Sequence, residues 1–249
     1  MSPGLFRNRY LRSVAGIFRF KQFDVNQEGC AMKVNTDGVL LGGLVSQQQP
    51  AAILDIGTGT GVIALMLAQR YQGAIVDAVE VDGHAASRAA ENFRNAPFSA
   101  RMNCYHTDFA DFNPVRSYDL MVSNPPYFID SLKNDSEKKA IARHGNVFFF
   151  DHLLQKAGKW LSDRGTLQII LPLPTADVVE KKADKHRLFL MNRKDIRSFA
   201  DKGPVRTILT LGKQPARTQP LTEVHTIYAE RGTYTAGYRQ LLKDFFLAF

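Results

Sequence analysis

The sequence has few cysteines and no long apolar run, and both absences exclude classes of protein. Cys30 and Cys104 are the only cysteines among 249 residues, and they lie far apart. They predict neither a disulfide framework nor a metal-binding cluster. No apolar stretch approaches the roughly 18 residues of a membrane span. Arginines interrupt every apolar run near the N-terminus, unlike in a secretory signal. We therefore expect a cytoplasmic chain without a membrane segment.

The six histidines are scattered, and no nucleophile–base set accompanies them. We expect no metal site, because the spacing of metal ligands is absent. His144, which follows Arg143 in the segment ARHG, is the one histidine that we single out, without a role. The sequence also contains no internal repeat and no low-complexity linker. One domain over residues 1–249 is expected, with a short basic N-terminal extension of about 35 residues.

Charge is distributed unevenly along the chain, which carries a formal net charge of +8. Residues 1–33 hold six basic and two acidic residues, and residues 181–217 hold eleven and three. Residues 34–180 hold twelve basic and sixteen acidic residues, and the remainder is balanced. An acidic middle between basic flanks suggests a polyanionic partner that contacts the flanks. The alternative is that these charges only solvate the surface.

From residue 52 onward, short apolar strands alternate with amphipathic helices. The segments AAILDI, AIVDAVEV, RMNCYHTD, YDLMVSN and GTLQIILP are typical of strands, and the segments between several of them have helical spacing. This alternation predicts an α/β fold with a mostly parallel sheet and helices on both faces. In such sheets ligands bind beyond the carboxyl ends of the strands. Four strand ends carry polar side chains: Asp55, Glu80, Asp108 and Asn124.

The segment DIGTGTG, residues 55–61, lies between a strand and a helix. Its glycines allow a tight turn and a close backbone approach to a ligand. Their G-x-G-x-G spacing differs from the dinucleotide fingerprint G-x-G-x-x-G, and no P-loop lysine follows. Glu80, at the end of the next strand, can accept hydrogen bonds from ribose hydroxyls, while Asp82 is the better helix N-cap. Asp108 can accept from an adenine amine beside Phe109, although Asp111 is a rival and a helix cap is the structural alternative.

The segment NPPY, residues 124–127, ends a buried strand with two prolines, which cannot continue a sheet. The Asn124 side-chain oxygen and the Pro125 carbonyl can accept the two hydrogens of a planar exocyclic amine and direct its lone pair. Pro126 restricts Pro125 to extended conformations. Tyr127 offers a ring on which a flipped base can stack.

Together these motifs resemble the class I S-adenosylmethionine-dependent amino methyltransferases. The segment FRFKQFDVNQEGCAMKVNTDGVLLGGLV, residues 18–45, with ARH near residue 143 and the closing LLKDFFLAF, resembles the tRNA1(Val) adenine-37 N6-methyltransferase family. The resemblance covers nearly the whole chain. It implies a Rossmann-like, mostly parallel seven-stranded sheet and transfer of a methyl group from S-adenosylmethionine to adenine N6 in tRNA. The sequence does not determine the oligomeric state, and a monomer is expected.

The resemblance also assigns roles to residues. It implies that the catalytic residues are Asn124, Pro125 and Tyr127. The cofactor-binding residues it implies are Lys33, Thr36, Asp55, Gly57, Gly59, Gly61, Glu80, Asp108, Phe109 and Asn124. From charge alone, the expected RNA contacts are Arg7, Arg9, Arg12, Arg143, Lys181, Lys182, Lys185, Arg187, Arg193, Lys194 and Arg197, bordering the edge that carries Asn124.

Other functions remain open at this stage. Glutamine methylation of release factors uses the same NPPY chemistry, but only 54 residues precede Asp55, too few for the helical substrate domain of those enzymes. DNA adenine methylation calls for a target-recognition region that we do not find, and the glycine spacing disfavours a dehydrogenase. Guanine-N2 or adenine-N6 methylation of ribosomal RNA, or a non-catalytic RNA-binding module, are the remaining alternatives.

Overall fold

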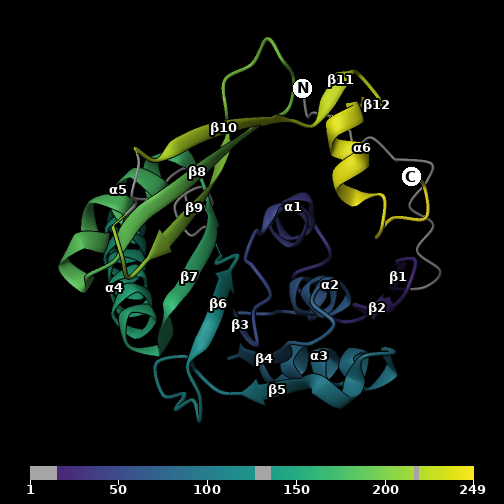
Figure 1. Cartoon of the computed structure of the whole chain (residues 1–249), viewed down its shortest axis with the longest axis horizontal. Coiled ribbons are helices and arrows are strands. Elements are labelled where there is room, and N and C mark those ends of the chain that lie inside the picture. Colours follow the sequence, from purple (N-terminus) through teal and green to yellow (C-terminus); the bar gives the residue numbers. More distant parts are fainter. Residues whose placement is uncertain (1–15, 127–135, 216–218) are drawn as a thin grey trace.

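The computed structural model describes residues 16–126, 136–215 and 219–249, with only the backbone for residues 136–147 (Figure 1). Its main feature is an eight-stranded sheet in the order β10-β8-β9-β7-β6-β3-β4-β5. The strands are β3 (Ala52–Ile56), β4 (Ile75–Glu80), β5 (Met102–His106), β6 (Tyr118–Ser123), β7 (Leu161–Leu171), β8 (Phe189–Arg197), β9 (Arg206–Gly212) and β10 (Leu221–Thr226). Strands β3 to β7 are those expected from the apolar segments.

The sheet is mostly parallel, and only β9 runs against its neighbours β7 and β8. Figure 1 shows helices on both faces. They are α1 (Thr36–Leu44), α2 (Val62–Arg70), α3 (Gly83–Asn95), α4 (Ser136–Trp160), α5 (Leu173–Ala183) and α6 (Ala236–Leu242). One apolar core lies under α1, α2 and α3, and a second lies under α4 and α5. The predicted fold class is confirmed, with β10 as one strand more than expected.

Strand β3 marks the point where the direction of strand order changes. It pairs with β4 on one side and with β6 on the other, and all three are parallel. The connections from β3 and β6 therefore leave the sheet in opposite directions and open a crevice above their carboxyl ends. Ile56 pairs with Ser123, so the loop that starts at Gly57 lies beside Asn124. All five residues of β3 are buried, as expected for a strand covered on both faces.

The N-terminal segment packs into the same core. Strands β1 (Ile17–Arg19) and β2 (Asp24–Asn26) form an antiparallel pair, and Phe20, Phe23 and Val25 are buried against the residues of α1 and α2. At the other end of the chain, β11 (Tyr228–Glu230) and β12 (Thr233–Tyr234) precede α6. The backbone N–H of Lys21 donates to the Phe245 carbonyl at 2.8 Å. Segments far apart in sequence therefore meet beside α1. The assignment of the chain to a single domain stays a prediction.

Candidate active site

The glycine loop after β3 is held by β4. The backbone N–H groups of Gly57 and Thr58 both donate to the Val79 carbonyl, at 2.9 and 3.1 Å. Gly57 and Gly59 have φ values of +70° and +58°, which favour glycine. A Cβ built on either residue would meet nothing within 4 Å, so the loop backbone faces open space. A ligand can therefore approach this backbone closely.

Gly61 has a different reason to be glycine. Its φ is +88°, and a Cβ there would lie 2.5 Å from Cε1 of Phe93 on α3. Gly61 is buried, so this glycine allows α3 to pack against the start of α2. The sequence pattern alone did not separate this packing role from the ligand-facing role of the other two glycines.

Asp55 lies fully buried beneath the loop. Its Oδ2 accepts hydrogen bonds from Thr58 Oγ1 at 2.6 Å and from the backbone N–H of Ala64 at 3.2 Å. It therefore caps α2, whose own N-cap, Gly61, has no side chain. Among the described residues, the buried Oδ1 atom has no partner. A cation or N–H donor above the loop would satisfy this oxygen.

Burial raises the pKa of Asp55 to about 7, despite the opposing hydrogen bonds from Thr58 and Ala64. Because the unfolded carboxyl titrates near pH 4, the folded chain binds more protons than the unfolded chain between pH 4 and pH 7. The contribution of Asp55 to folding stability is therefore largest at low pH and decreases as pH rises through this window.

We expect Asp55→Asn to remove this part of the pH dependence, by about 1.4 kcal/mol for each unit of pKa difference. Urea unfolding of the wild type and of Asp55→Asn at pH 4.5 to 8 measures this effect. The difference between their curves of unfolding free energy against pH cancels the contributions of all other titrating groups. Parallel curves would mean that Asp55 does not titrate in this range.

Glu80 ends β4 with its carboxylate turned towards the glycine loop. Oε2 accepts from the backbone N–H of Gly59 at 2.8 Å, and Oε1 accepts from that of Asp82 at 2.9 Å. The side chain is oriented by both bonds, and each oxygen keeps a second lone pair for a ligand hydroxyl. The predicted N-cap role of Asp82 is confirmed, because its Oδ1 accepts from the Ala85 N–H at 2.8 Å.

Asp108 follows β5 at the same edge and is exposed. Its Oδ1 accepts from the Ala110 N–H at 2.8 Å, which is a local turn bond. Among the described residues, its other oxygen accepts no hydrogen bond, so a cap and a ligand contact are compatible. The Phe109 ring packs edge-on against Phe149 with centroids 5.2 Å apart. The rival Asp111 is also exposed, and its backbone N–H closes the same turn by donating to the Asp108 carbonyl at 3.0 Å.

Asn124 directly follows β6 and lies beside the first turn of α1. A Cβ at Gly38 of α1 would be 3.8 Å from Asn124 Nδ2 and 3.5 Å from Cγ1 of Val62 on α2. The preceding residue, Ser123, donates its hydroxyl to the Ile56 carbonyl at 2.9 Å and ties β6 to β3. Pro125 is buried, whereas Tyr127 lies outside the described residues.

The start of α1 brings the N-terminal segment to Asn124. Asn35 caps this helix, with its Oδ1 accepting from the Gly38 N–H at 2.9 Å. Thr36 and Lys33, both predicted to contact a cofactor, are exposed here. Asp37 is paired with Arg206 at 2.9 Å. The first turn of α1 is thereby fixed to the strand edge that carries Asn124.

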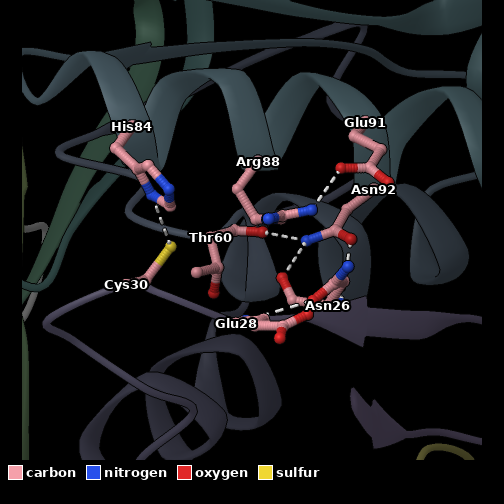
Figure 2. Close-up of polar contacts among 8 residues, drawn as sticks. All are labelled: Asn26, Glu28, Cys30, Thr60, His84, Arg88, Glu91 and Asn92. Atoms are coloured by element: carbon pink, nitrogen blue, oxygen red, sulfur yellow. Dashed lines mark hydrogen bonds and ion pairs between the residues drawn. The ribbon is translucent and has the colours of Figure 1, made fainter. Parts of the chain in front are cut away.

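The sequence analysis missed Asn92, a buried residue of α3 that joins three segments (Figure 2). Its Nδ2 donates to the carbonyls of Asn26 and Thr60, and its Oδ1 accepts from the Asn26 N–H, all at 2.9 Å. Nearby, Cys30 Sγ lies 3.6 Å from His84 Nδ1. Asn92 thus holds the N-terminal segment against the glycine loop. The only sequence signal was a polar residue on the otherwise apolar buried face of an amphipathic helix.

The basic residues of the 181–217 region do not share one edge of the sheet. Helix α5 joins β7 to β8, and both strands run towards the Asn124 edge. Its C-terminal end must therefore lie at the opposite edge. That end carries Lys181, Lys182, Lys185 and Arg187. The prediction that these four residues border Asn124 is wrong.

Two of the remaining predicted RNA contacts, Arg193 and Lys194, already bind acceptors within the protein. Arg193 is paired with three carboxylates, those of Asp177, Glu180 and Asp195. Lys194 is 7% exposed, and its Nζ donates to the Leu44 carbonyl at 2.7 Å, where a cation stabilises the C-terminal end of α1. The prediction of an RNA contact is therefore wrong for Lys194.

Arg197 alone of the candidates on β8 lies at the Asn124 end of that strand, where its Nε donates to Thr226 Oγ1 at 2.9 Å. Arg7, Arg9, Arg12 and the side chain of Arg143 lie outside the described residues. The loop after β8 adds Lys202, whose side chain is exposed beside Asp201. Among the described residues of this region, fewer cations therefore lie at the Asn124 edge of the sheet than the number of basic residues in the sequence suggested.

Within the described ranges, no cluster of three or more His, Cys, Asp or Glu side chains could hold a metal ion. In the same part of the chain, no helix has both the length and the apolar character needed to cross a bilayer.

Comparison with known proteins gives the following similarities. Residues 30–192 match the model of the methyltransferase small domain family. The tRNA1(Val) (adenine(37)-N6)-methyltransferase of Pedobacter heparinus is 49% identical over 93% of this chain and 98% of its own length. The Parabacteroides distasonis protein of the same name is 39% identical over 92% and 97%.

Among solved structures, one from Agrobacterium tumefaciens, described as a predicted O-methyltransferase, has a TM-score of 0.67 at 21% identity and covers 84% of this chain and 96% of its own. The CcbJ methyltransferase of Streptomyces caelestis has a TM-score of 0.51 at 13% identity and covers 71% and 93%. At these identities, the two structures show the fold alone.

Proposed function

Because this chain belongs to the tRNA1(Val) (adenine(37)-N6)-methyltransferase family, we propose that it methylates the exocyclic N6 of adenine 37 in tRNA1(Val), with S-adenosylmethionine as the methyl donor. The observation that carries the proposal is the position of Asn124 beside the glycine loop, above the adjoining ends of β3 and β6. An amine-holding side chain and a cofactor loop at one switch point make up a methyl-transfer site.

The described residues fit the cofactor. The open backbone of Gly57 and Gly59 can lie against its methionine part, and the unpaired buried oxygen of Asp55 offers an acceptor beneath. The oriented carboxylate of Glu80 can bind the ribose hydroxyls. Asp108 and Phe109 lie at the next strand end, where an adenine would follow the ribose. We assign Lys33 and Thr36 to the segment that borders this site.

Asn124 would hold the target amine through its side-chain oxygen, and the Pro125 carbonyl would accept the second hydrogen. These acceptors draw the nitrogen towards tetrahedral geometry and aim its lone pair. When bound, S-adenosylmethionine supplies the methyl group, whose carbon–sulfur bond breaks as the nitrogen–carbon bond forms. Because the nitrogen becomes acidic as it gains the methyl group, it can release its proton to water, and the chain needs no strong base. Tyr127 would stack on the flipped adenine.

Mass analysis of nucleosides tests the proposed substrate. Bulk tRNA from a strain that lacks this gene should lose N6-methyladenosine, and the purified protein should restore it to tRNA1(Val) in vitro. Loss of a methylated guanine or adenine from ribosomal RNA instead, with tRNA unchanged, would replace this proposal with the ribosomal alternative.

We expect RNA affinity to depend on cations at the Asn124 edge and not on the larger basic group at the opposite edge. Each lost phosphate contact lowers the slope of the logarithm of the binding constant against the logarithm of salt concentration by about 1. The double variant Arg197→Ala with Lys202→Ala should therefore reduce the slope by about 2. The matched pair Lys181→Ala with Lys185→Ala removes the same charge at the opposite edge and should leave it unchanged. Binding of tRNA at several salt concentrations measures both, and the reverse pattern would move the RNA to the α5 end.

A further inference from the structure

A cavity of about 470 Å³ lies where the N-terminal segment, the start of α1 and the C-terminal segment meet. Figure 1 shows α1, β1 and α6 on the same side of the sheet. Five aromatic rings line the cavity, those of Phe18, Tyr234, Tyr238, Phe246 and Phe249. The volume falls within the range of sites that hold small planar ligands. None of the glycine loop, Glu80 or Asp108 lines it, and Thr36, which we assign to the segment bordering the cofactor site, is the one residue common to both.

The rings form a connected wall. Phe246 and Phe249 lie 5.5 Å apart between centroids, and Phe249 meets Tyr234 edge-on at 5.4 Å. The Arg239 guanidinium carbon is 5.7 Å from the Phe249 ring centroid, at the exposed margin of the cavity. Apolar ring surface beside a guanidinium is the combination that binds a nucleobase with its phosphate in single-stranded RNA.

The cavity adjoins the proposed target site through the first turn of α1. Asn35 and Thr36 line the cavity. Gly38 lies two residues after Thr36, which is about 3 Å along the helix axis. A Cβ built on Gly38 would lie 3.8 Å from Asn124 Nδ2. One turn of helix therefore separates the space beside Asn124 from the aromatic cavity. Asn35 and Thr36 also provide polar groups that can reach the edge of a base.

We propose that this cavity binds a second nucleobase of the substrate RNA, one that flanks the target adenine. The inference rests on the proposed function, because a flanking base exists only if the substrate is a nucleic acid. Splaying two neighbouring bases into separate pockets positions a loop more firmly than one flipped base, since each stacked base adds binding free energy. The cavity then contributes to the choice of RNA, while Asn124 acts on the amine.

Filling the cavity tests this inference without removing its walls. Ala248 is exposed and lines the cavity, so Ala248→Trp should occupy it. Leu247 is 65% exposed and does not line it, and Leu247→Trp is the matched control. For Ala248→Trp we expect the KM for tRNA to rise about 10-fold or more, with kcat and S-adenosylmethionine affinity unchanged. The control should match the wild type. An unchanged KM in Ala248→Trp overturns the inference.

RNAs that lack one base identify the occupant. Two stem–loop substrates, each abasic at one position beside the target adenine, are methylated by the wild type and by Ala248→Trp. For one of the two positions, we expect that removing the base lowers the kcat/KM of the wild type by about the same factor as Ala248→Trp lowers it with the intact RNA. It should cost Ala248→Trp nothing further, because both changes remove one interaction. The cavity inference alone is overturned if the losses in kcat/KM from base removal and from the tryptophan multiply. It is also overturned if both abasic RNAs have the same kcat/KM as the intact RNA. A wild-type protein that methylates no adenine in the intact RNA overturns the proposed function as well.

Discussion

Asn124→Ala is expected to lower kcat by about 10²–10³, the range seen when one preorganised partner of a transition state is lost. The amide oxygen would bind the amine most strongly when its nitrogen is pyramidal, so its loss affects the chemical step more than binding. Asn124 also lies beside Gly38, and alanine is small enough to leave the first turn of α1 in place. Single-turnover methyl transfer to tRNA1(Val) measures the rate, and calorimetry with S-adenosylmethionine should give nearly wild-type affinity.

Two comparisons make the Asn124 result specific. Asn113→Ala, at an exposed position before β6, removes an equivalent amide and should keep wild-type activity. Raising the pH should not restore Asn124→Ala, because the proposed role is to hold the amine and not to accept its proton. Recovery at high pH would refute the amine-holding role and assign the residue to proton transfer.

Glu80→Ala is expected to reduce S-adenosylmethionine affinity by about 10² or more. Each hydrogen bond to a charged acceptor contributes about 1.5–3 kcal/mol, and both ribose hydroxyls would lose their partner. The same change frees the backbone N–H of Gly59, which Glu80 holds at 2.8 Å. The loop would then lose part of its orientation before the cofactor arrives. Calorimetry with S-adenosylmethionine and with its demethylated product measures the effect, and neither the wild type nor the variant should bind NAD.

A control variant that removes a different carboxylate shows whether the effect of Glu80→Ala comes from lost ribose contacts or only from the lost negative charge. Glu91 lies on α3, where it pairs with Arg88, and Glu91→Ala should leave cofactor affinity unchanged. A thermal melt shows whether each variant is folded. Wild-type affinity in a folded Glu80→Ala protein would remove Glu80 from the cofactor site.

The central strands, and with them the edge of the sheet that carries the candidate site, could be predicted from local patterns. The apolar runs that became β3, β4 and β6 are central strands in which all residues but one in β4 and one in β6 are buried, and such runs are distinctive because both faces of a parallel sheet are covered. Their carboxyl ends necessarily share one edge. Four polar residues far apart in sequence, from Asp55 to Asn124, could therefore be placed together before any coordinates were known.

Charge was less informative than pattern. Lysines and arginines that are adjacent in a strand point to opposite faces of the sheet, and those in the last turn of a helix lie away from the edge where the helix begins, so a basic segment is not a basic surface. Lys194 became a buried partner of the α1 carbonyls, and Lys181 lies at the edge opposite to Asn124. Nothing local distinguishes these two residues from Arg197.

The sequence by itself determined the sheet, the glycine loop and the NPPY segment proposed to hold the amine, because each depends on short-range spacing and on the chemistry of a few adjacent residues. Only the tertiary structure decided the role of Asn92, the packing requirement at Gly61 and the aromatic cavity. Asn92 bonds to residues 32 and 66 positions away, and the cavity joins Phe18 to Phe249. Such contacts form between segments whose own patterns carry no record of one another, so they become visible only when the folded chain brings those segments together.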